Sequence, residues 1–68
     1  MDLGTFTWGG HAGTQYLAPE FPEGGIDGGH LVFAWNEGDV EAAVSLHAWR
    51  PLEQAVATLK AVVSSIVP

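Results

Sequence analysis

The stretch from residue 30 to residue 49 constrains the fold most strongly. It contains two strand-like runs, HLVFAW and VEAAVSLHAW, separated by the short polar segment NEGD. Apolar runs on either side of a glycine-containing turn are typical of a β-hairpin. We therefore predict a central hairpin over residues 30–49. A two-residue turn at Glu37-Gly38 would place Trp35 opposite Val40 and His30 opposite Ser45.

In this register the hairpin has two chemically different faces, because successive side chains of a strand point to opposite sides. The more apolar face carries Leu31, Phe33, Trp35, Val40, Ala42, Val44, Leu46 and Ala48. The other face carries His30, Val32, Ala34, Glu41, Ala43, Ser45, His47 and Trp49. A slip of one residue in a strand would exchange its faces. The first face is the predicted core side, and the second has no obvious cover.

The segments on either side of the hairpin differ from each other in character. Residues 5–8 alternate Thr-Phe-Thr-Trp, which predicts a short N-terminal strand ended by Gly9-Gly10. Residues 11–29 hold most of the glycine and proline, and we predict a wrapping loop in which residues 14–17 form at most one strand-like turn. Residues 51–66 predict a helix, with Pro51 at its first position and apolar residues at the 3.6-residue period.

These elements predict a single α+β domain over residues 1–68. Its parts are a strand and loop over residues 1–29, a hairpin over 30–49 and a helix over 50–68. The sheet would be small and antiparallel, with three or four strands packed against the C-terminal helix. A domain of this size buries only about 60% of its unfolded surface, so it usually needs further support. The chain has no cysteine, which leaves good packing, a metal or a second chain.

The charge of the chain excludes several classes of partner. The formal net charge is −6, and Arg50 and Lys60 are the two basic residues. Binding of nucleic acid requires clusters of Lys and Arg, and an anionic membrane surface attracts the same residues. We expect neither partner. No signal peptide or transmembrane run is visible, so the sequence is compatible with a cytoplasmic protein or a mature secreted domain.

Three histidines are candidate ligands for a divalent metal. His30 and His47 would lie near each other on the second hairpin face, and His11 would reach them from the wrapping segment. Imidazole is a common ligand of zinc. The spacing matches no known metal motif, and the alternative is that these rings simply bond to backbone or water.

The remaining candidates concern a ligand, an interface or catalysis. Ser45 beside His30 would be a nucleophile next to a base, but no nucleophile elbow or oxyanion loop accompanies it. Tyr16 and Trp49 could frame a groove or simply complete the core. The residues favour a non-catalytic binding or assembly module, which self-associates or binds a protein through the second sheet face. Metal or small-ligand binding through His11, His30 and His47 is the second hypothesis, and a minimal hydrolase using Ser45 is the third.

Overall fold

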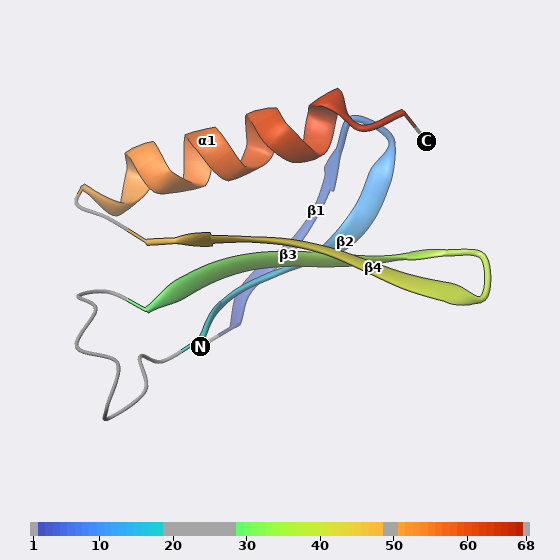
Figure 1. Cartoon of the computed structure of the whole chain (residues 1–68), viewed down its shortest axis with the longest axis horizontal. Helices are drawn as coiled ribbons and strands as arrows, with labels where there is room; N and C mark the ends of the chain where they lie inside the picture. Colours follow the sequence, from blue (N-terminus) through green and yellow to red (C-terminus); the bar gives the residue numbers. More distant parts are fainter. Residues whose placement is uncertain (1, 19–28, 49–50, 68) are drawn as a thin grey trace.

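Four antiparallel strands and one helix make up the structure, a computed structural model that describes residues 2–18, 29–48 and 51–67. The strands are β1 (Asp2–Trp8), β2 (His11–Ala18), β3 (His30–Glu37) and β4 (Val40–His47), and they pair in the order β1-β2-β3-β4. The helix α1 (Leu52–Ser65) lies across one face of this sheet (Figure 1). The predicted α+β class, with an antiparallel sheet against one C-terminal helix, is confirmed.

The core forms between α1 and the apolar side of the central strands. Leu31, Phe33 and Trp35 of β3 point toward the helix and pack with its buried residues. On the helix these buried residues are Ala55, Leu59 and Val63. Trp8 extends the core onto β1 by stacking on Phe33, with ring centroids 4.3 Å apart. The predicted apolar side of β3 is therefore the core side.

The helix is slightly shorter than predicted. Pro51 is the N-cap with an extended backbone (φ −73°, ψ 145°), so it stands one position before the first helical residue. The predicted apolar stripe is buried only along its centre, because Leu52, Val62 and Ile66 remain 37–41% exposed. The apolar stripe is therefore wider than the part of the helix surface that contacts the sheet.

Strand β2 is the largest departure from the predicted architecture. The prediction of a wrapping loop over residues 11–29 is wrong for its first part, because His11–Ala18 is an inner strand paired on both sides. Gly9 and Gly10, with φ of 58° and 86°, form the two-residue loop that joins β1 to β2. Positive φ at both loop positions is the pattern of the type I′ hairpin turn. Gly9-Gly10 is therefore a hairpin turn as well as a strand end.

The second turn also differs from the prediction, and the hairpin register moves with it. The loop is Gly38-Asp39, which puts Glu37 opposite Val40 and Trp35 opposite Ala42. Tight hairpin turns require positive φ at the first loop position. Gly38 adopts it, with φ of 62°, whereas the predicted Glu37-Gly38 turn would force it on a glutamate. The cross-strand pairs shift by two residues along β4, so the two faces keep the predicted composition.

One buried polar group stands out on the core side of β2. Gln15 is 3% exposed, and its Oε1 has no hydrogen-bond partner among the described residues. A buried acceptor without a partner loses its hydration and gains nothing in exchange, at a cost of about 1–3 kcal/mol. This position therefore reduces the stability of the fold.

We expect Gln15→Met to raise the free energy of unfolding by about 1 kcal/mol, because Met has a similar shape and leaves no oxygen to desolvate. Urea unfolding followed by tryptophan fluorescence measures the change, and an unaltered slope m would show that the unfolded state is unaffected. A loss of stability in Gln15→Met would contradict the assignment of this oxygen as a destabilising group.

Candidate functional site

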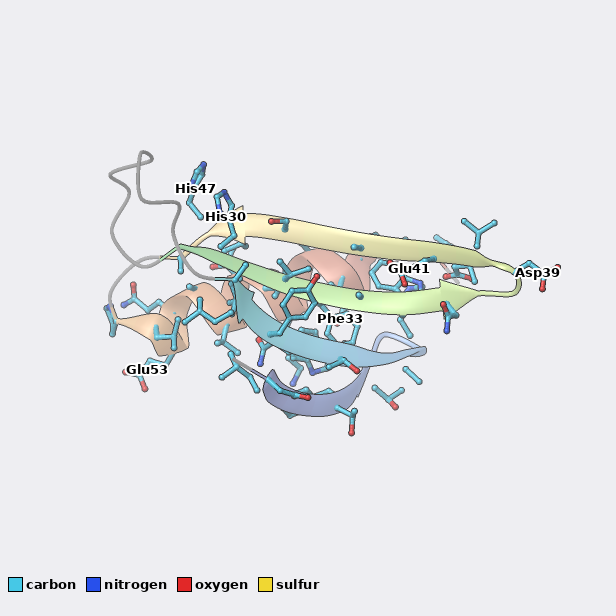
Figure 2. All side chains as sticks on the ribbon, turned by 90° about the horizontal axis from the view of Figure 1, so that it is seen from below. His30, Phe33, Asp39, Glu41, His47 and Glu53 are labelled. Atoms are coloured by element: carbon cyan, nitrogen blue, oxygen red, sulfur yellow. The ribbon has the colours of Figure 1, made fainter. Side chains whose placement is uncertain are left out.

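His30 and His47 lie side by side on the sheet face opposite α1. They are direct cross-strand partners, and their ring centroids are 4.5 Å apart with the ring planes inclined by 42°. Figure 2 shows both rings at the same end of the β3–β4 hairpin, away from its turn. His30 is half-buried and His47 is exposed. The predicted proximity of these two histidines is confirmed, and they are closer than the predicted diagonal arrangement.

The corrected register separates Ser45 from His30. Ser45 stands opposite Val32, while His30 stands opposite His47. The predicted cross-strand pair of a serine nucleophile and a histidine base is therefore wrong. The cause is the turn, since the shift from Glu37-Gly38 to Gly38-Asp39 moves every β4 partner by two residues.

His11 lies far from this pair and on the other face of the sheet. The residue is about 2% exposed, and its ring packs on the core residue Trp35 with ring centroids 4.8 Å apart. One ring nitrogen, Nε2, lies 2.7 Å from the carbonyl oxygen of Ile66, and the other, Nδ1, lies 3.1 Å from Oε1 of Glu37. The three predicted metal ligands therefore do not converge in this chain.

The contacts of His11 give it a structural role. Both ring nitrogens face oxygen acceptors, and only the doubly protonated imidazole can donate to both of them. The same Glu37 Oε1 accepts a hydrogen bond from Trp35 Nε1 at 2.7 Å. His11 thus joins the first residue of β2 to the end of β3 and to the backbone just after α1. No local sequence pattern marks this role, because its partners are 26 and 55 residues away.

The other two predicted site residues have different outcomes. Tyr16 is 38% exposed and stands in one row with Val32 and Ser45 on the face opposite α1. A neighbouring row consists of the small residues Thr14, Ala34 and Ala43. Trp49 lies outside the described residues. The second sheet face therefore combines one exposed aromatic ring, small side chains and the histidine pair.

The free edge of β4 is a candidate interaction surface. The backbone N–H of Ala48 donates to the carbonyl of Gly29, which shows that the even-numbered residues direct their backbone groups toward β3. Because the direction alternates along an antiparallel strand, the N–H and C=O groups of Glu41, Ala43, Ser45 and His47 point away from the sheet. An edge of this kind is a template for another strand.

The two edges of the sheet are not equally open. The pairing of β4 with β3 runs without interruption from Val40 to His47, and β4 contains no proline, lysine or bulge. On β1 the register shifts between Asp2 and Gly4, and the Asp2 carboxylate accepts the Gly4 N–H at 2.7 Å. Bulges of this kind disturb pairing with further strands. The open edge is therefore the one at β4.

The charged and titratable groups of β4 lie at opposite ends of the strand. Glu41 is next to the turn, whereas His47 is at the far end beside His30 (Figure 2). Both side chains lie on the face opposite α1, because they are six residues apart on the strand. In the described part of the chain, no group of three or more His, Cys, Asp or Glu side chains is close enough to hold a metal ion.

We expect Glu37→Ala to lower the free energy of unfolding by about 1–2 kcal/mol, because it removes the acceptor of the Trp35 indole and one contact of His11. The Glu37 side chain is 45% exposed, so water can replace part of the hydrogen bonding that the variant loses. Glu37→Gln is the matched control, since its amide oxygen can still accept from the indole. Chemical unfolding measures both variants, and equal destabilisation by both would contradict a role for the shared oxygen.

The described residues include no helix long and apolar enough to cross a membrane. Comparisons of the chain with protein-family models, curated proteins and solved structures found no match.

Proposed function

We propose that this chain is a non-catalytic assembly module that self-associates by pairing the β4 edges of two copies. The observation that supports the proposal is the β4 edge, which pairs with β3 without interruption and has no further strand on its outer side among the described residues. Its outward-directed backbone groups are satisfied equally well by water or by another strand, and a second copy brings an identical strand. A two-fold axis at the centre of β4 would make the pair antiparallel and closed.

Two requirements limit the register of such a pair. The outward-directed residues must face each other to exchange hydrogen bonds, and side chains on the same face must meet. The register in which Val44 meets Val44 of the second copy fulfils both. It places Ala43 opposite Ser45 and Glu41 opposite His47 of the second copy, so a carboxylate meets an imidazole at each end. In the alternative register, Ala43 lies opposite Ala43 of the second copy. This register loses the charge complementarity, because Glu41 then faces Ser45 of the second copy.

The expected affinity is modest. A typical stable interface buries about 1,600 Å² in total, and the pairing of two eight-residue strands buries less than this. Both chains carry a formal net charge of −6, which adds repulsion between the copies. We therefore expect a dimer that dissociates on dilution and strengthens with added salt, which screens the repulsion.

The second sheet face remains the alternative surface for the same function. It carries the exposed Tyr16 and the row of Thr14, Ala34 and Ala43, whose small side chains allow close approach. It continues directly to the β4 edge. Substitutions in the centre of the sheet would weaken the binding of a partner that covers this face. They would leave pairing at the β4 edge unaffected.

We expect sedimentation equilibrium to give a mass that rises with concentration toward two chains. Ala43→Pro should weaken the dimer about tenfold or more, since it removes two symmetry-related edge hydrogen bonds and leaves the β3 ladder intact. Thr5→Pro is the matched control, because it changes an outward-directed residue on the β1 edge. Ser45→Lys and Thr5→Lys repeat the comparison without proline strain.

A monomer mass at all concentrations would overturn the proposal. Ala34→Glu tests the alternative surface, since Ala34 lies on β3 in the middle of the second face. Dissociation by Ala34→Glu, together with a normal dimer in Ala43→Pro and Ser45→Lys, would move the interface from the edge to the face. Circular dichroism confirms that each variant is folded before its mass is compared.

A further inference from the structure

We infer that pairing of the two β4 edges completes a divalent transition-metal site from His30 and His47 of one copy and Glu41 of the other. This inference rests on the proposed self-association and identifies its ligand. Each dimer would hold two such sites, related by the two-fold axis. Within one chain the site is incomplete, which agrees with the lack of a three-ligand cluster among the described residues.

The histidine pair supplies the first two ligands. His30 and His47 face each other across the β3–β4 ladder at a non-hydrogen-bonded position, because the bonded positions of β4 are the even-numbered ones. Side chains are closest at such positions, and the two ring centroids are 4.5 Å apart. None of the hydrogen bonds or ion pairs identified among the described side chains involves either ring. Two neighbouring imidazoles with available nitrogens suit Zn²⁺, Cu²⁺ or Ni²⁺.

The second copy supplies the third ligand. In the register with Val44 on the axis, Glu41 of the second copy is the direct neighbour of His47 on the side away from His30. All three side chains lie on the face opposite α1, because paired residues of neighbouring strands share a face. Two imidazoles and a carboxylate are a common protein ligand set for zinc, with the remaining position open to water.

The charges favour the same arrangement. Two chains with a formal net charge of −6 repel each other when they associate. Two divalent cations at the ends of the shared interface would offset part of this repulsion. An ion pair between Glu41 and His47 would use only one ring of each histidine pair, whereas a metal uses both rings and the carboxylate.

Zn²⁺ is the probe for the test. We expect one Zn²⁺ per chain by isothermal titration calorimetry, and a decrease in the dimer Kd of about tenfold or more when Zn²⁺ is added, a coupling common for linked binding events. EDTA should reverse the change. Co²⁺ provides an independent readout, because its visible absorption reports the coordination number of the bound ion.

The variants separate the metal site from the dimer. His30→Phe should dimerise as the parent chain does without metal, and it should lose the response to Zn²⁺, because His30 is remote from the β4–β4 contact. Glu41→Gln should also lose the tenfold decrease in the dimer Kd that Zn²⁺ causes. Its amide can still lie opposite His47 of the second copy, so the metal-free dimer should be retained. Glu53→Gln is the matched control, since it removes an exposed carboxylate of α1 outside the proposed site.

The outcomes distinguish this inference from the proposed function. A dimer that neither binds Zn²⁺ nor responds to it would overturn the metal site and leave self-association in place. Equal Zn²⁺ affinity in the parent chain, Glu41→Gln and the dissociated Ala43→Pro variant would show a two-histidine site within one chain, which contradicts the shared site. A monomer with and without Zn²⁺ would overturn both.

Discussion

A single helix must cover a four-stranded sheet, and this limitation determines which surfaces of the sheet the helix leaves open. α1 can bury only one face, where Leu59 and Val63 meet Leu31, Phe33 and Trp35. Among the described residues, α1 covers neither the opposite face nor the two sheet edges, although Val32 on the opposite face is buried. These surfaces differ from one another. The open face carries small and polar side chains, the β1 edge has a bulge, and the β4 edge is a regular strand without a bulge. The site proposed here lies where the open face reaches the open edge.

The elements that follow a clear periodicity could be predicted from the sequence. The alternation in residues 30–49 and the 3.6-residue period after Pro51 both correspond to elements of the structure. β2 could not be predicted as an inner strand, because three of the four residues on its core side are not hydrophobic. These four residues are His11, Gly13, Gln15 and Leu17. An inner strand with a polar inward face shows no apolar alternation. Its sequence signals were therefore the Gly9-Gly10 turn that precedes it and the strand-like character of residues 14–17, which is too short to indicate an inner strand.

The candidate site was predictable only in part. The face of His30 and His47 followed from side-chain alternation, which survives a shift of two residues. Their direct opposition did not follow, because it depends on which residue of the turn adopts positive φ. The role of His11 could not be read from the sequence at all. It depends on Glu37 and on the backbone of Ile66, and these residues meet only after the sheet and the helix have packed together.

The Gly38-Asp39 turn determines more than the shape of one loop. One extra residue there keeps the register only if the loop absorbs it as a three-residue turn. If strand β4 absorbs it instead, β4 is inverted relative to β3, which turns Val44 and Leu46 toward water and His47 toward the core. The inversion would also redirect the backbone groups that now lie along the free edge. A residue added at Gly9-Gly10 would instead disturb β1 and β2 and leave the β4 edge unchanged. Natural length variation should therefore be tolerated unequally at the two turns, and the second turn is the place where a change in length would alter the fold and the assembly together.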